Sequence, residues 1–159
     1  MKHKESVKKF VDEKKDELIN ISNDIYTNPE LAFEEVYASQ RLSGYLKDNG
    51  FKIEIPYKGL ETSFNATYSH LNGDKEIVIM AEYDALPNGH SCGHNVIAAS
   101  GIGAGIAAKQ ALIDLDIPGI IRVVGTPAEE KGGGKIILLD NGAFETSDAV
   151  LLLHPTTGV

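Results

Sequence analysis

The chain has 159 residues and a net charge of −8, from 15 lysines and arginines against 23 aspartates and glutamates. With 42% hydrophobic and 24% charged residues, it has the composition of one globular domain with its own core, which excludes a disordered chain and a coiled coil. The acidic balance provides no basic surface for a phosphate backbone, so we expect no nucleic-acid partner.

The first fifty residues predict two helices. Over Val7–Ile25 apolar residues recur at spacings of three, four and seven on a charged background, which is typical of an amphipathic helix. Pro29 ends this helix, because proline has no amide to donate and disfavours helical geometry in the residue before it. A second helix is expected over Glu34–Leu46, ending at Asn49-Gly50, where glycine can take the left-handed closing conformation.

Beyond Gly50 the pattern changes to strands that later alternate with helices. The turn Asn72-Gly73-Asp74 is typical of a hairpin between two of the strands. The expected elements are strands at Phe51–Ile55, Ser63–His70 and Glu76–Ala81, a helix of small residues at Asn95–Asp114, a buried strand at Ile120–Val124, a helix at Lys135–Leu139 and a buried strand at Ala149–Leu153. This order predicts an α/β fold whose last strand lacks a covering helix, as in an incomplete domain.

Cysteine usage and hydropathy indicate the compartment. A single cysteine excludes an internal disulfide, and the chain starts with charged residues rather than an apolar signal core, so we expect a reduced, cytoplasmic protein. The longest apolar runs, such as residues 77–81 and 149–153, are far shorter than the roughly 20 residues that a spanning helix needs. We therefore expect no membrane partner.

Polar clusters follow the predicted strands at the points where the strands end. The clusters are Glu82-Tyr83-Asp84, His90–His94, Glu129-Glu130 and His154. Because open α/β sheets bind ligands outside the carboxyl ends of their strands, one crevice can collect all four clusters. The sequence therefore predicts a site at this end of the sheet.

Cys92 and His94 are separated by one glycine. In an extended segment their side chains, together with that of His90, would face the same way and can bind one metal ion. The alternative is a partly buried cysteine beside histidines that bond only to the backbone. The triplet alone leaves both interpretations open.

The carboxylates and the last histidine have alternatives too. Adjacent carboxylates at Glu129 and Glu130 are expected to point different ways, so that one binds metal while the other acts as a general base. A pair of this kind is otherwise typical of a solvated loop. His154 directly follows an apolar strand, which suits either a functional residue or a hydrogen-bonded histidine at a strand end.

Two glycine-rich segments superficially resemble nucleotide-binding loops. Gly101–Gly105 lacks the G-x-G-x-x-G spacing and follows a loop, so we expect close helix packing there. Gly132–Lys135 lacks the first glycine and the Ser/Thr of a phosphate loop, so we expect a flexible turn beside the site.

Four motifs in order carry a resemblance to a known family. They are Glu82–Pro87, Gly89–Asn95, Gly125–Glu130 and His154-Pro155, and they resemble the zinc-dependent aminoacylase/carboxypeptidase family of metallopeptidases. Within the family the chain resembles the amidohydrolase branch, which includes aminoacylase-like dipeptidases, p-aminobenzoyl-glutamate hydrolases and auxin-conjugate hydrolases, and it is similar to a staphylococcal aminohydrolase. The resemblance implies a mixed-sheet, zinc-exopeptidase-like catalytic domain. Residues 1–159 would be its N-terminal portion, truncated before the lid and dimerisation domain.

The resemblance also implies roles for the site residues. Two divalent ions are expected, zinc or alternatively manganese, cobalt or nickel. Cys92 corresponds to the ligand that bridges the ions, His94 and His154 to terminal ligands, Glu130 to a carboxylate ligand, Glu129 to the general base, and Asp84 to the residue that orients His94. The family supplies a further histidine ligand after the lid, in a part that residues 1–159 are not expected to include. Asn95 stands where the wider branch has aspartate.

Three functions follow as hypotheses. The first is a metal-dependent amidohydrolase that cleaves a small N-acyl amino acid, dipeptide or aminobenzoyl-glutamate-like substrate. The second is a truncated, inactive metal-binding fragment, whose C-terminal part exists as a separate chain. The third is a cysteine hydrolase that uses Cys92 with His94, although their spacing suits joint metal ligation better than a nucleophile–base pair.

Overall fold

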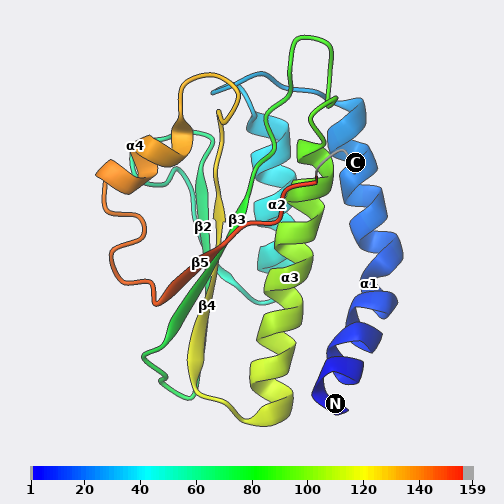
Figure 1. Cartoon of the computed structure of the whole chain (residues 1–159), viewed down its shortest axis with the longest axis vertical. Helices are drawn as coiled ribbons and strands as arrows, with labels where there is room; N and C mark the ends of the chain where they lie inside the picture. Colours follow the sequence, from blue (N-terminus) through cyan, green and yellow to red (C-terminus); the bar gives the residue numbers. More distant parts are fainter. Residues whose placement is uncertain (1, 156–159) are drawn as a thin grey trace.

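The computed structural model describes residues 2–155, in which a five-stranded sheet lies between two layers of helices (Figure 1). The elements are α1 (Lys2–Thr27), α2 (Val36–Asp48), β1 (Lys52–Glu54), β2 (Phe64–His70), β3 (Glu76–Ala81), α3 (His94–Leu115), β4 (Gly119–Gly125), α4 (Gly134–Asp140) and β5 (Ala149–Leu151). Every helix and strand expected from the sequence is present, with ends that differ by a few residues. The α/β class with a mixed sheet is confirmed.

The sheet has the order β1-β2-β4-β3-β5. β3 runs parallel to both β4 and β5, whereas β2 is antiparallel to β1 and β4. The expected hairpin at Asn72-Gly73-Asp74 is therefore wrong, because β4 lies between β2 and β3. Val78 and Ile79 are both buried, and a strand that is buried on both faces suits the centre of a parallel sheet better than one arm of a hairpin.

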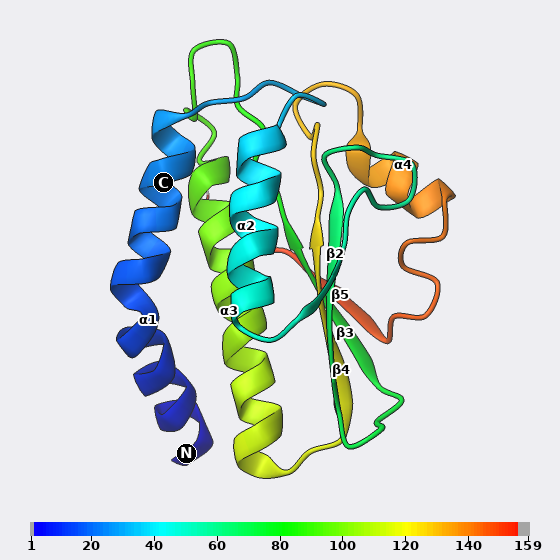
Figure 2. The same cartoon turned by 180° about the vertical axis from the view of Figure 1, so that it is seen from behind.

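Side chains of the central strands alternate between two cores. Ile79 and Val123 face the larger core under α1, α2 and α3, while Val78 and Val124 face a smaller core that includes Leu138 of α4. Figures 1 and 2 show the same arrangement from opposite sides, with α1–α3 on one face of the sheet and α4 on the other. This layering leaves the carboxyl ends of β3 and β4 open to a shared loop region.

The small residues of α3 allow it to approach the sheet and α1 closely. A Cβ atom on Gly101 would lie 2.9 Å from the carbonyl oxygen of Met80, and one on Gly103 would lie 3.0 Å from Leu18. The expectation of close helix packing at Gly101–Gly105 is confirmed.

The helix α3 combines a length of 22 residues with a high mean hydropathy. Among the described residues, α3 alone is long and apolar enough to cross a membrane by these two measures, and 50% of its apolar window is buried inside the domain. The core helix of a globular domain has these properties too.

Two glycine substitutions test this packing. Gly105→Ala should lower the free energy of unfolding by about 1–3 kcal/mol, because its Cβ would lie 2.3 Å from Val123 Cγ2 in a full core. Gly44→Ala in α2 has no atom within 4 Å of the new Cβ, so it should raise stability by about 0.5–1 kcal/mol through helix propensity. Urea unfolding of both variants checks the prediction, and equal shifts would contradict it.

The last strand departs from its expected burial. The sequence predicts a buried strand at Ala149–Leu153, but all three residues of β5 are exposed, with Leu151 at 55%, and Leu153 beyond the strand is 70% exposed. β5 pairs with β3 alone, and within residues 2–155 no helix covers its outer face. The apolar run therefore indicates a strand that the described part of the chain leaves uncovered.

Candidate metal centre

Side chains from separate elements meet at the carboxyl ends of the parallel strands. Glu82 and Asp84 follow β3, the Glu129-Glu130 pair follows β4, His154 follows β5, and His94 begins α3. The structure therefore brings together all four polar clusters that the sequence places at strand ends. They meet because β3, β4 and β5 are parallel, so that the loops after them leave the same edge of the sheet.

Cys92 and His94 meet through a turn rather than through an extended segment. Gly93 between them has φ 83°, a left-handed conformation that suits glycine, and His94 is the first residue of α3. The expected extended geometry is thus wrong, although the two side chains do converge. Ligand atoms of Cys92, His94 and Glu130 all lie within 4.8 Å of one another.

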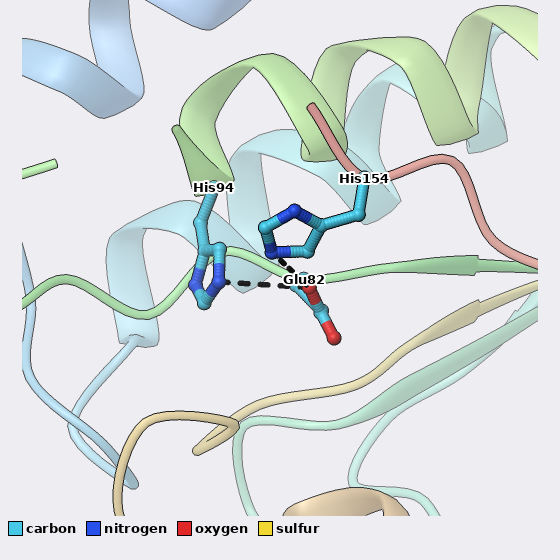
Figure 3. A group of neighbouring side chains, drawn as sticks. All are labelled: Glu82, His94 and His154. Atoms are coloured by element: carbon cyan, nitrogen blue, oxygen red, sulfur yellow. Dashed lines mark ion pairs between the residues drawn. The ribbon is translucent and has the colours of Figure 1, made fainter. Parts of the chain in front are cut away.

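A second group of potential ligands shares His94. Its members are Glu82, His94 and His154, whose ligand atoms also lie within 4.8 Å of one another. Figure 3 shows the Glu82 carboxylate facing both imidazole rings. His94 Nε2 lies 3.5 Å and His154 Nε2 4.0 Å from Glu82 Oε2. Neither group includes His90, which the sequence places on the same face as Cys92 and His94.

Glu129 and Glu130 approach the same atom. Glu129 Oε2 lies 3.7 Å and Glu130 Oε1 3.8 Å from His94 Nε2, so the expectation that these carboxylates point different ways is wrong. They differ in surroundings instead. Glu130 belongs to the group with Cys92, whereas Glu129 belongs to neither group and its side chain is 36% exposed against 25% for Glu130.

Asp84 bonds both to His94 at the start of α3 and to Glu130 in the loop after β4. Its Oδ1 lies 3.0 Å from His94 Nδ1, and its Oδ2 accepts a hydrogen bond from the Glu130 amide at 2.9 Å. Burial alone would lower the pKa of His94, but the hydrogen bond and negative charge of Asp84 outweigh it and raise the pKa above its usual value. Burial likewise opposes ionisation of Asp84, yet these same hydrogen bonds hold its pKa below the usual range.

Glu35 supports the loop that presents the two glutamates. Its carboxylate is fully buried and accepts hydrogen bonds from the Ala128 amide and the Thr62 hydroxyl, each at 2.8 Å. Ala128 has φ 57°, which is unfavourable for a residue with a Cβ, so the turn needs such support. Burial raises the pKa of Glu35. No sequence pattern points to this role, because the partners of Glu35 lie far along the chain.

The thiol of Cys92 is protonated at neutral pH in the absence of metal. Burial and the nearby Glu130 carboxylate raise its pKa to about 11. A cysteine nucleophile requires the opposite, a lowered pKa that supplies thiolate. This environment disfavours a cysteine hydrolase.

The clustered side chains are suited to bind a divalent cation, because two of their buried atoms lack hydrogen-bond partners among the described residues. Glu82 Oε2 and His94 Nε2 are buried and make no hydrogen bond to any residue in the described range 2–155. Buried polar atoms normally have partners, and leaving one unsatisfied costs about 1–3 kcal/mol. Thiol, imidazole and carboxylate groups are the ligands that zinc and similar ions bind.

Lys135 is a further residue at the site. Its ammonium group contacts Glu82 Oε1 from the first turn of α4. The sequence places Glu82 in a strand-end cluster but predicts no chemical role for it or for Lys135. The position of Glu82 directly after β3, two residues before Asp84, is the one available signal.

A pocket of about 590 Å³ adjoins Glu130. Its lining is mainly apolar and includes Leu31, Phe33, Leu86 and Pro87. A larger hollow of about 1010 Å³ lies between α2 and β1 and contains none of the clustered ligands. The smaller pocket is therefore the one that a molecule bound at the cluster would reach.

Known proteins are similar in sequence to this chain over most of its length. The Xaa-Arg dipeptidase of Mus musculus is 38% identical over 158 residues, which cover 92% of this chain and 36% of the relative. A p-aminobenzoyl-glutamate hydrolase polypeptide of Escherichia coli is 31% identical, covering 86% of this chain and 32% of the relative. The chain thus spans about a third of the length of these relatives. No family model matches it.

Solved structures show the same fold. A protein described as an aminohydrolase from methicillin-resistant Staphylococcus aureus has a TM-score of 0.79 and 25% identity, over 91% of this chain and 40% of that one. A dinuclear metal-binding peptidase of Bacillus subtilis has a TM-score of 0.79 and 27% identity, over 88% of this chain and 43% of that one.

The chain has the fold of the corresponding part of these proteins, and its clustered side chains could hold a metal ion. These relatives, of which the chain spans about a third, support the resemblance to the aminoacylase/carboxypeptidase family of metallopeptidases and to its amidohydrolase branch.

Proposed function

We propose that residues 1–159 form the N-terminal portion of the catalytic domain of a cytoplasmic, metal-dependent amidohydrolase. The proposed substrate is a small N-acyl amino acid, a dipeptide or an aminobenzoyl-glutamate-like amide. The observation that carries this proposal is the convergence of Cys92, His94 and Glu130 within 4.8 Å around a buried imidazole nitrogen that has no partner among the described residues. The named activities of the relatives support the reaction class.

Two divalent ions, with zinc as the proposed metal, would be held by four residues. Cys92 is the proposed bridging ligand, and His94, Glu130 and His154 are the proposed terminal ligands. The peptidase from Bacillus subtilis supports a dinuclear centre, since it is named as one. Asp84 is the proposed positioning residue, because its contacts fix both the His94 ring and the Glu130 backbone.

Glu129 is the proposed general base. Bound divalent ions supply the electrophilic chemistry, by lowering the pKa of a water molecule and polarising the amide carbonyl. Glu129 is the more exposed carboxylate beside His94, which suits it to accept the proton of the attacking water and to return it to the leaving amine. The apolar pocket beside Glu130 offers a place for the substrate group next to the amide.

A second candidate is a metal-binding fragment without activity of its own. The uncovered β5 and the limited coverage of the relatives favour it. In that case a separate polypeptide would supply the rest of the catalytic domain.

Hydrolysis assays distinguish these candidates. The chain is tested alone and together with a polypeptide that supplies the part of the relatives it does not span, against N-acyl amino acids, dipeptides and p-aminobenzoyl-glutamate. Loss of activity with a chelator and recovery with zinc is the expected result for the amidohydrolase. Metal binding by the chain alone, with hydrolysis only when the second polypeptide is present, would support the inactive fragment. Hydrolysis that resists the chelator and is lost in Cys92→Ala would support a cysteine hydrolase.

Zinc affinity should increase with pH. The pKa of Cys92 is about 11 and that of His94 is raised in the metal-free chain, so metal must displace protons that both groups hold more tightly than usual. Each proton released changes the affinity by up to about tenfold per pH unit, in the direction of weaker binding at lower pH. Competition with a chromophoric chelator at two pH values measures this, and a pH-independent affinity would contradict it.

A further inference from the structure

Glu82 is a fully buried carboxylate whose two oxygens have different surroundings. Oε1 accepts a hydrogen bond from the ammonium group of Lys135, whereas Oε2 makes no hydrogen bond to any described residue. That free oxygen lies 3.5 Å from His94 Nε2 and 4.0 Å from His154 Nε2. The ion pair with Lys135 therefore satisfies only one of the two carboxylate oxygens.

The tautomers of the two histidines make the free oxygen significant. His94 Nδ1 lies 2.8 Å from the backbone oxygen of Asp84, and His154 Nδ1 lies 2.8 Å from the backbone oxygen of Pro155. A carbonyl oxygen only accepts hydrogen bonds, so each Nδ1 carries the proton. In the neutral rings both Nε2 atoms then present lone pairs.

With both rings neutral, as metal ligation requires, three lone-pair atoms converge without a donor between them. Glu82 Oε2 and the two Nε2 atoms lie within 4.8 Å of one another and cannot hydrogen-bond to each other when the rings are neutral. A cation placed among them satisfies all three, whereas a purely structural Glu82–Lys135 ion pair leaves the buried Glu82 Oε2 and His94 Nε2 without a partner among the described residues.

The glycine turn before α4 makes the contact with Lys135 possible. Gly132 and Gly133 have φ values of 122° and 65°, which favour glycine. A Cβ on Gly134 would lie 1.9 Å from the carbonyl oxygen of Pro127, so the start of α4 packs directly against the loop after β4. This close approach places Lys135 beside the end of β3.

We propose that Glu82 is an additional metal ligand, which binds one divalent ion through Oε2 together with His94 and His154, while Lys135 holds Oε1. This inference rests on the proposed metal centre and adds a ligand to it. Lys135 is the positioning residue of the pair, because it fixes the carboxylate orientation and compensates its charge.

Zinc titration of the 159-residue chain tests this role, with affinity and stoichiometry as readouts. Glu82→Gln should weaken the affinity for one zinc equivalent by about tenfold or more. Lys135→Met should weaken it by a smaller factor, and Lys135→Arg should restore most of it, because arginine keeps the charge. The visible spectrum of bound cobalt(II) should change in Glu82→Gln, as expected when a ligand is replaced.

Glu76→Gln is the matched control. Glu76 is buried and bonded to a cation like Glu82, since its Oε1 lies 2.7 Å from Arg122 Nη1, but it stands at the opposite end of β3. Its replacement should leave zinc affinity unchanged. If Glu82→Gln does not fold by circular dichroism, Glu82→Asp keeps the charge and shortens the reach, and it should show the same loss of affinity.

The outcomes separate this inference from the proposed function. If the unaltered chain binds no divalent ion, both the proposed metal centre and the role of Glu82 as a ligand are contradicted. If it binds zinc, and Cys92→Ala abolishes binding while folded Glu82→Gln or Glu82→Asp binds like the unaltered chain, the metal centre stands and Glu82 is not a ligand. Weakened binding in the Glu82 variants with normal binding in Glu76→Gln supports the inference.

Discussion

Glu129→Gln should retain metal and lose turnover by a factor of about 10² or more in an active amidohydrolase that contains this chain. Glu129 lies beside His94 but belongs to neither group of clustered ligands, and it is the more exposed of the two adjacent carboxylates. Glutamine keeps its size and removes its ability to accept a proton. We therefore expect kcat to fall while metal content, measured by atomic absorption, stays the same.

Glu130→Gln is the matched variant for this prediction. Glu130 lies with Cys92 and His94 in one group of potential ligands, so the loss of its charge should weaken metal retention. The two adjacent carboxylates are thus told apart by metal content rather than by rate alone. Equal metal loss in both variants would contradict this division of roles.

The isolated 159-residue chain should self-associate through β5. This edge strand exposes unpaired backbone groups together with apolar side chains, among them Val150 and Leu151, and Leu153 beyond the strand is also exposed. Exposed edges of this kind pair with other chains. Analytical ultracentrifugation should show oligomers, and a hydrophobic dye should bind.

Leu151→Lys should shift the chain toward the monomer, because a charge on an edge strand opposes pairing. Ile117→Lys is the control, since Ile117 is also exposed, at 45%, but lies in the turn between α3 and β4. It should leave association unchanged. A monomeric unaltered chain, or equal effects of both substitutions, would contradict association through β5.

Local patterns predict the elements well, because each helix and strand has its own hydrophobic period. The amphipathic stripe ending near Ile25 and the apolar run at Glu76–Ala81 correspond to α1 and β3 with little change. Pairing is less predictable. The Asn72-Gly73-Asp74 turn is typical of a hairpin, yet β4 separates the two strands, because pairing depends on burial across the whole sheet.

Exposure of the last strand shows the same limit. An apolar run such as Val150–Leu153 indicates that a strand is suited to burial, but not whether an element is present to cover it. In the described residues β5 is uncovered. The run predicts the strand correctly and its burial wrongly, whereas the expectation from the element order that no helix covers this strand holds for the described residues.

The site is predictable in part. Convergence at strand ends follows from the α/β order, and proximity in sequence points to Cys92 and His94. Sequence patterns assign no role to Glu82 or Lys135, because their contact depends on how α4 packs against the end of β3, 53 residues away along the chain. The supporting role of Glu35 is not predictable either, because its hydrogen-bond partner Ala128 lies 93 residues away along the chain.

Zinc retention by the unaltered chain and by a Cys92→Ala/His94→Ala double variant tests the metal centre most directly. After equilibrium dialysis at neutral pH, the unaltered chain should hold zinc and the double variant should not, because His94 is shared by both groups of ligands. His70→Ala, which removes a histidine at the end of β2, should retain zinc like the unaltered chain. Equal zinc in the unaltered chain and the double variant would contradict the proposed centre.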